Sequence, residues 1–211
     1  MGVDEISLSN IWQVRYVTAE GEIKPGDFRD LDGVVESALK KARWQIKPSK
    51  IPDELRSAWR SIEFGDFGAA GKDISEAMKS NDEEVKSAAK KLKSAAMKAL
   101  KRQANPAMKL ARDGDFWPAY QEISRLCSTF ESYDVPAKLV KAQKALEKKD
   151  QVKNELRADK KLQAAIELGS NKRMISLAKK RLKAITQDFP TTDAANTARE
   201  KLGLKKKARF R

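Results

Sequence analysis

The chain has 211 residues, of which 40% are hydrophobic and 35% are charged, so it carries enough apolar residues to fold around a core. It has no histidine and a single cysteine, Cys127. These counts exclude an internal disulfide, most metal sites and the Ser-His and Cys-His nucleophile systems. No run of 18 apolar residues occurs, so the sequence predicts no membrane-spanning helix.

The net charge of +14 is concentrated toward the end of the chain. Residues 1–50 carry 8 basic and 8 acidic side chains, whereas residues 151–211 carry 17 basic and 6 acidic ones, a net +11. This imbalance favours an anionic partner, which would be nucleic acid, a membrane surface or an acidic protein. A solvated lysine-rich helical surface explains it equally well.

The first segment with a clear pattern predicts a small β-containing head. Residues 11–18, IWQVRYVT, alternate between apolar and polar side chains, as in a half-buried strand. The turn AEG precedes an antiparallel return strand at 22–24, and Pro25 and Gly26 are expected to end this hairpin. A helix capped by Asp30 then follows to about residue 43.

The order of strand, turn, strand and helix over residues 9–43 resembles the C-terminal half of a thioredoxin-like domain. In that family, a strand ending in a glycine-containing turn is followed by a second strand and a closing amphipathic helix. The chain departs from the family because it has no Cys-x-x-Cys motif and no proline before the first strand. No redox residue can therefore be assigned from this resemblance, and an unrelated ββα cap remains the alternative.

The remainder of the chain predicts helices separated by glycine and proline. A linker with two prolines, residues 47–54, comes first, and the polar stretch EKKDQVKN within 136–168 is either a solvated helix or a break. Pro106 is expected to kink or divide the helix that contains it. The predicted helices span 53–64, 67–80, 82–113, 117–131, 136–168, 171–188 and 192–202.

One motif, Gly-Asp-Phe-x-x-Ala, occurs twice, at 65–70 and at 114–119. Each glycine is expected to end one helix in a left-handed conformation before the next helix starts. Gly169, with an alanine nine positions later, is a looser third copy. A phosphate-binding loop would need more glycines and a preceding strand, so we interpret the motif as a structural turn. The predicted turn residues are Gly65, Asp66, Phe67, Gly114, Asp115 and Phe116.

Helical hairpins repeated at intervals indicate an α-solenoid. The turn motif resembles that of tetratricopeptide-like (TPR-like) repeats, in which a small residue, an aromatic residue and another small residue follow one another. The stretch DFPTTDAANTAREKL at 188–202 is similar to a repeat unit of bacterial envelope proteins such as the Tol-Pal coordinator. This resemblance covers 53–203 and implies protein–protein interaction without catalysis. The usual 34-residue spacing is not kept, which weakens the expectation of a regular groove.

Two further features bear on function. Cys127 has apolar neighbours and is expected to be a buried small residue. The helix predicted at 171–188 carries a row of cations with no acid on the same face, which could form one basic surface with the tail. The candidate anion-binding residues are Lys172, Arg173, Lys179, Lys180, Lys183, Lys205, Lys206, Lys207, Arg209 and Arg211.

The sequence therefore predicts a mainly α protein, a TPR-like α-solenoid of antiparallel helical hairpins with a small N-terminal ββα element. The predicted parts are a ββα element at 1–46, a linker at 47–54, a repeat domain at 55–203 and a basic tail at 204–211.

The first predicted function is a non-catalytic protein–protein interaction scaffold with no catalytic residue, cofactor or metal. The alternatives are binding of nucleic acid or an anionic surface through the basic face, and the C-terminal portion of a thioredoxin-like redox protein without its active site. The start of the chain has no signal-peptide pattern, so the sequence as written predicts a cytoplasmic protein. A longer natural chain would favour the periplasm or envelope.

Overall fold

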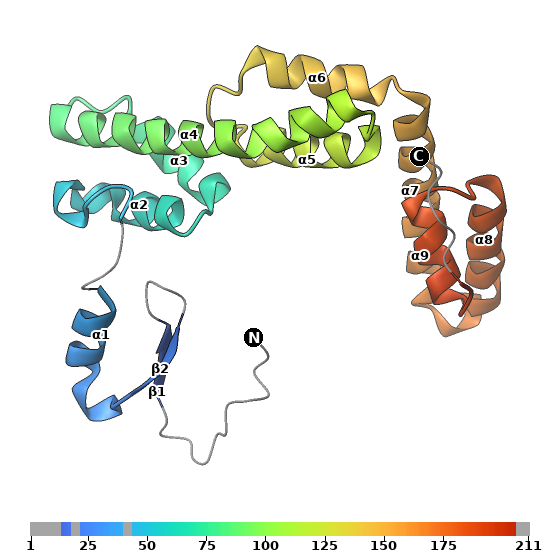
Figure 1. Cartoon of the computed structure of the whole chain (residues 1–211), viewed down its shortest axis with the longest axis horizontal. Helices are drawn as coiled ribbons and strands as arrows, with labels where there is room; N and C mark the ends of the chain where they lie inside the picture. Colours follow the sequence, from blue (N-terminus) through green and yellow to red (C-terminus); the bar gives the residue numbers. More distant parts are fainter. Residues whose placement is uncertain (1–13, 18–21, 40–43, 206–211) are drawn as a thin grey trace.

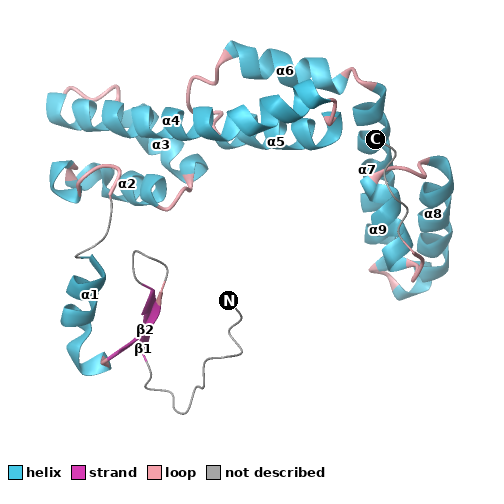
Figure 2. Cartoon of the chain, in the orientation of Figure 1, coloured by secondary structure: helices cyan, strands magenta, loops and turns pink. Residues whose placement is uncertain are grey.

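The computed structural model describes residues 14–17, 22–39 and 44–205. In these residues the protein is mainly helical, with a single two-stranded antiparallel sheet near the N-terminus (Figures 1 and 2). The prediction of a mainly α protein with a small ββα element is confirmed at this level.

The sheet pairs strand β1, Val14–Val17, with strand β2, Ile23–Gly26. The predicted hairpin is therefore present, although residues 11–13 and 18–21 lie outside the described residues. The prediction that Pro25 and Gly26 end the hairpin is wrong, because both belong to β2 and Pro25 is paired with Arg15. Each strand of a two-stranded sheet is an edge strand, and an edge strand tolerates the missing N–H of proline.

Helix α1, Leu31–Leu39, follows β2 after a 3-10 turn at Phe28–Asp30. As predicted, Asp30 caps this helix: its carboxylate accepts a hydrogen bond of 3.0 Å from the backbone N–H of Gly33. The expected end of the helix near residue 43 lies outside the described residues.

Residues 44–46 are held against helix α2, Arg56–Glu63, by hydrogen bonds and a ring contact. The Glu63 carboxylate accepts hydrogen bonds from the N–H groups of Gln45 and Ile46, each 3.0 Å long. The indole N–H of Trp59 donates to the Ile46 carbonyl at 2.8 Å, and its ring lies 5.2 Å from that of Trp44. The predicted linker, 47–54, is partly ordered into two 3-10 turns.

The helices of the remaining chain match most of the predicted pattern. They are α2 (Arg56–Glu63), α3 (Phe67–Ala77), α4 (Glu83–Asp113), α5 (Phe116–Thr129), α6 (Ala137–Glu147), α7 (Asp150–Gly169), α8 (Ile175–Asp188) and α9 (Asp193–Lys201).

The two predicted interruptions, at Pro106 and in the polar stretch of 136–168, have different outcomes. Pro106 does not divide α4, which continues past it to Asp113. Both Pro106 and Arg102 are exposed, so water can satisfy the Arg102 carbonyl that the proline leaves without a donor, while the opposite face of α4 is held by the core. The polar stretch in 136–168 is a break, because α6 and α7 are separated at Lys148 and Lys149.

Gly65 and Gly114 form equivalent turns at the ends of α2 and α4, as predicted. Their φ angles are 82° and 90°, in the left-handed region that glycine adopts at little cost. In each turn the next residue donates its N–H to the carbonyl five residues earlier, at 2.8 Å from Asp66 and 3.0 Å from Asp115. This bond is part of the Schellman motif. A third turn of this kind follows α9 at Gly203, whose φ is 71°.

The looser third copy at Gly169 is not such a turn. Gly169 is the last residue of α7, and no positive φ occurs there. The two true copies also differ after the glycine. The Asp66 side chain caps α3 by accepting from Ala69 N–H at 3.2 Å, whereas the Asp115 side chain makes no cap bond.

The helices contact one another in two alternating rows. From α2 onward, each helix packs against the next one along the chain, and in addition α2 contacts α4 and α4 contacts α6. On the other side, α3 contacts α5 and α5 contacts α7. One row is therefore α2, α4 and α6, and the other is α3, α5 and α7.

Most of the buried apolar side chains of the described residues belong to one of two clusters. The first extends from Ile51 to Leu146 and holds α2 to α6 together, and the second extends from Ala158 to Ala198 within α7 to α9. Figure 1 shows α7 turning steeply away from the direction of α4 and α6, with α8 and α9 beside it. The break between α6 and α7 is therefore where the chain passes from one cluster to the next.

One side-chain hydrogen bond joins α5 to α9, and two further bonds join α9 to α7. The indole N–H of Trp117, on α5, donates to the Asp193 carboxylate at 3.0 Å. The Asp193 backbone N–H, at the start of α9, donates to both oxygens of the buried Glu155 on α7, at 3.0 and 3.2 Å. A carboxylate at a helix N-terminus is favoured by the helix dipole.

Candidate functional site

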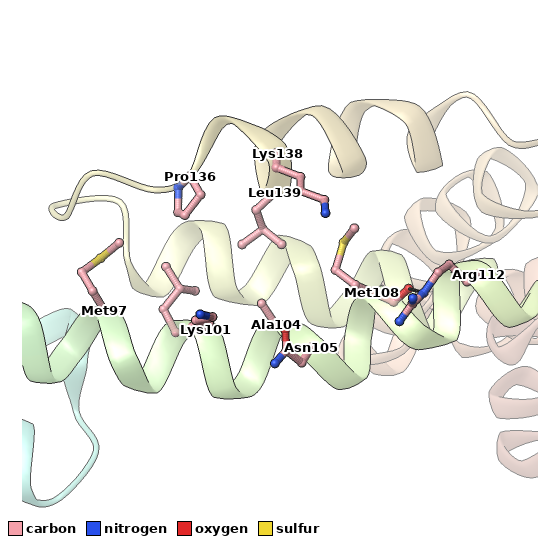
Figure 3. A pocket seen from close by; sticks show the side chains of 10 residues that line it. Met97, Lys101, Ala104, Asn105, Met108, Arg112, Pro136, Lys138 and Leu139 are labelled. Carbon is pink, nitrogen blue, oxygen red and sulfur yellow. Dashed lines mark hydrogen bonds between the residues drawn. The ribbon is translucent and has the colours of Figure 1, made fainter.

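A hollow in the helical part lies between α4 and α6, which are neighbours in the same row. It has a volume of about 730 Å³ and opens to solvent (Figure 3). Figure 3 shows the side chains of Met97 and Met108, from α4, and of Leu139, from α6, directed into the space between the two helices. We call this hollow the α4–α6 groove. It is lined by Met97, Leu100, Lys101, Ala104, Asn105, Met108, Arg112, Pro136, Lys138 and Leu139.

The α4 wall of the groove follows from helical spacing. Positions 97, 101, 104, 108 and 112 are four, three, four and four residues apart, so they lie along one face of the helix. This face adjoins the buried stripe of α4 that packs on α5. The long run of α4 through Pro106 places all five positions on one continuous wall.

The floor of the groove is apolar. Leu100 and Leu139 are buried, with 1% and 4% of their surface exposed, whereas Met97, Ala104 and Met108 are only half-buried. Ala104 is small and lies between the two methionines, which leaves room above it. Methionine side chains are flexible and polarisable, so they adapt to partners of different shape.

The edges of the groove are basic. Its ionisable side chains are Lys101 and Arg112 on α4 and Lys138 on α6, and no carboxylate occurs among the described residues that line it. The Arg112 Nε donates to the Met108 carbonyl at 3.3 Å, which holds the guanidinium at the edge of the groove. The groove therefore combines an apolar floor with positive charge on both walls.

An ion pair positions the loop that leads into α6. Asp134, in this loop, accepts a hydrogen bond from the Lys93 ammonium on α4. This hydrogen bond, and then the charge of Lys93, lowers the pKa of Asp134 from its ordinary value. The loop is further held by Tyr133, whose hydroxyl donates to the Phe67 carbonyl at 2.8 Å.

Four lysines on and just after α6 form a second basic surface. Lys141, Lys144, Lys148 and Lys149 line a shallow hollow of about 520 Å³ together with Ala145. The Lys149 ammonium also lies 4.7 Å from the centre of the Phe116 ring. These residues extend the positive charge of α6 beyond the α4–α6 groove.

The predicted basic face is present in part. The prediction of one helix over 171–188 is wrong at its start, because Lys172 and Arg173 lie in a 3-10 turn and α8 begins at Ile175. The tighter turn changes the angle between these two cations and those of α8, so Lys172 and Arg173 do not share one helical face with Lys179, Lys180 and Lys183. Ile175, the first residue of α8, is 41% exposed.

The cations of α8 itself are placed as predicted. Lys179, Lys180 and Lys183 are exposed, and no salt bridge joins them to a carboxylate in the part of the chain that the structure describes. Lys205 is also exposed. The remaining tail candidates lie outside the described residues, and they are Lys206, Lys207, Arg209 and Arg211.

The turn residues have structural surroundings. Phe67 is buried and stacks on Phe130, with ring centres 5.0 Å apart. In the second copy Phe116 is only half-buried, and the next residue, Trp117, is buried in its place. The same motif thus anchors the following helix through different aromatic residues.

Cys127 is half-buried against the first cluster, so the expectation of full burial holds only in part. Desolvation by this burial raises the pKa of the Cys127 thiol. A raised pKa reduces the thiolate fraction, and the thiolate is the nucleophilic form.

Sequence reasoning did not find the α4–α6 groove. The sequence does contain a signal for it, because Met97, Ala104 and Met108 repeat at helical spacing beside the buried alanines of α4. The sequence does not show that α6 lies next to this face, because the position of α6 depends on the path of the loop at 130–136.

Comparison of the chain with protein-family models, with curated proteins and with solved structures gave no match. The described helices include none with the length and apolar character needed to cross a membrane. Within the same residues, no group of three or more His, Cys, Asp or Glu side chains is arranged to hold a metal ion.

Proposed function

We propose that the protein is a non-catalytic helical-repeat scaffold that binds a partner protein in the α4–α6 groove. The observation that carries this proposal is the groove itself: an open hollow of about 730 Å³ with an apolar floor and basic edges. Such hollows, with a few placed polar groups, are where proteins bind ligands and partner side chains.

The arrangement of the helices supports a repeat scaffold of the TPR-like type. Helices in two alternating rows are what an α-solenoid has, and the row α2, α4 and α6 presents the groove between two of its members. The equivalent turns at Gly65 and Gly114 fit the same plan. The solenoid therefore serves in this proposal as the frame that holds two walls of the binding groove.

The chemistry of the groove supports binding in preference to catalysis. Among its described lining residues there is no carboxylate or thiol, and the sequence has no histidine. The carboxylate, imidazole and thiol groups that often act as general bases or nucleophiles are thus missing from the described lining of the groove.

Site-specific photo-cross-linking in the organism that makes the protein tests the proposal. A benzophenone amino acid replaces Ala104 on the groove floor, and in a matched variant it replaces the exposed Lys160 on α7. We expect a discrete adduct with another protein at position 104 and none at position 160. The absence of an adduct at 104, or equal adducts at both positions, would contradict the proposal.

A second candidate, binding of nucleic acid or another polyanion, is favoured by the exposed and unneutralised Lys179, Lys180 and Lys183 on α8. Phosphate contacts release counterions, so binding of this kind weakens steeply as salt rises. We expect Glu at these three positions to abolish retention on heparin and DNA without loss of helix. Unchanged retention of the triple variant would exclude α8 as the binding surface.

A further inference from the structure

We infer that the α4–α6 groove binds an acidic amphipathic helix of a partner protein. This inference rests on the proposed function and adds the conformation and charge of the bound segment. It is drawn from the backbone of the groove walls, the length of the floor and the sign of the edges.

The walls of the groove indicate a helical occupant. A bound strand needs an exposed sheet edge, and both walls are helices whose backbone groups bond within the helix. A polyproline segment needs aromatic walls, and none of the described lining residues is aromatic. An amphipathic helix needs only an apolar groove, which is what Leu100, Leu139 and the two methionines provide.

The dimensions of the floor suit two to three helical turns. From Met97 to Met108 there are eleven steps along α4, or about 16 Å at the helical rise of about 1.5 Å per residue. Apolar anchors at i, i+4 and i+7 of a partner helix span about 10 Å, and one more turn fills the floor. The hollow above Ala104 receives the central anchor, and Met97 and Met108 adapt around its neighbours.

The basic edges of the groove favour a partner helix that has acidic residues on both sides of its apolar face. Lys101 and Arg112 stand on the α4 side of the floor and Lys138 on the α6 side, so cations border the apolar stripe on both sides. Lys141, Lys144 and Lys148 lie on another face of α6 and add to the positive potential near the groove, which raises the encounter rate with an acidic partner. A basic helix of equal hydrophobicity would be repelled by the same groups.

Nucleic acid fits the groove less well. Single strands bind on aromatic side chains against which their bases stack, and the described lining of the groove offers none. A polyanion would contact the lysines but not the apolar floor. Competition between an oligonucleotide and a helical peptide therefore distinguishes the two kinds of ligand.

The test uses the full chain and two fluorescein-labelled synthetic peptides of about 18 residues, about 27 Å long as helices. Both carry leucine at the same i, i+3, i+4 and i+7 positions, and the other positions are mostly Glu in one peptide and mostly Lys in the other. Fluorescence anisotropy follows binding at about 50 and about 150 mM salt. We expect the Glu peptide to bind at least about tenfold more tightly than the Lys peptide.

Charge reversal separates specific recognition from loss of folding. In the double variant Lys101→Glu, Lys138→Glu, we expect the Glu peptide to lose at least about tenfold in affinity and the Lys peptide to gain. The matched control, Lys179→Glu, Lys180→Glu, changes the net charge equally on α8 and should leave Glu-peptide binding within about twofold. A gain for the Lys peptide cannot come from an unfolded chain.

Three results would overturn the inference: equal binding of both peptides, a charge reversal that does not switch the preference, or an equal loss in the α8 control. A single-stranded oligonucleotide that competes fully with the Glu peptide would also overturn it, in favour of a polyanion site. If Ala104 cross-links to a partner protein but the Glu peptide does not bind, the scaffold stands and the acidic helix fails. If neither occurs, both fail.

Discussion

Replacing Gly114 by alanine tests the left-handed turn that joins α4 to α5. Gly114 has a φ of 90°, and an added Cβ would meet no heavy atom within 4 Å, so no clash contributes to the effect. The left-handed conformation costs a non-glycine residue about 1–2 kcal/mol. The loss of unfolded-state freedom offsets about 0.4–1 kcal/mol of this cost, which leaves a net destabilisation of about 1 kcal/mol.

Gly68, in the first turn of α3, provides a matched control with the opposite sign. It is helical, and an added Cβ would lie 3.6 Å from the Thr129 carbonyl oxygen, an ordinary contact. Alanine is favoured over glycine within helices by about 0.5–1 kcal/mol, so Gly68→Ala should stabilise the protein by about this amount.

Urea unfolding followed by far-ultraviolet circular dichroism measures both changes. With a denaturant slope of about 2 kcal/mol per molar urea, the midpoint should fall by about 0.5 M for Gly114→Ala and rise for Gly68→Ala, with slopes unchanged. A Gly114→Ala chain as stable as the parent, or shifts of the same sign in both variants, would show that the left-handed conformation at Gly114 does not disfavour alanine.

Three further changes probe the packing. In Tyr133→Phe a buried hydrogen bond is lost, and we expect about 1 kcal/mol less stability at neutral pH. Burial raises the pKa of Tyr133 from 10.0 to about 12, so the advantage of the parent is complete below pH 10.0 and is lost as pH rises to about 12, which parallel urea titrations would show. Gly71→Ala places a Cβ 2.6 Å from the Ser132 Cβ and should cost about 1–3 kcal/mol, part of which Ser132→Gly restores in a thermal double-mutant cycle. Glu155→Gln weakens the bond to Asp193 N–H and should cost about 1 kcal/mol in urea unfolding; no loss would show that the carboxylate charge contributes nothing to the start of α9.

The features that the sequence predicted well are local ones. The left-handed turns at Gly65 and Gly114 follow from the conformational freedom of glycine after an amphipathic helix, and the cap at Asp30 follows from the need of first-turn N–H groups for an acceptor. Both depend on residues within a few positions of each other, so a sequence pattern suffices to find them.

The features that the sequence did not decide depend on tertiary contacts. Whether Pro106 divides its helix depends on the packing of α4 against α5, which the pattern around Pro106 does not contain. The α4–α6 groove joins Met97 and Met108 to Leu139, more than thirty positions later in the sequence. Nothing in the spacing of α4 indicates that α6 rests beside that face.

The most direct test of the account is a methyl NMR spectrum of the full chain with ¹³C-labelled methionine. The described methionines provide two probes in the groove, Met97 and Met108, and two outside it, Met78 and Met174. On addition of the Glu-rich amphipathic peptide, we expect the Met97 and Met108 resonances to move together along one titration curve while those of Met78 and Met174 stay in place. Movement of Met174 alone, or no movement of Met97 and Met108 at saturating peptide, would contradict the claim that partners bind between α4 and α6.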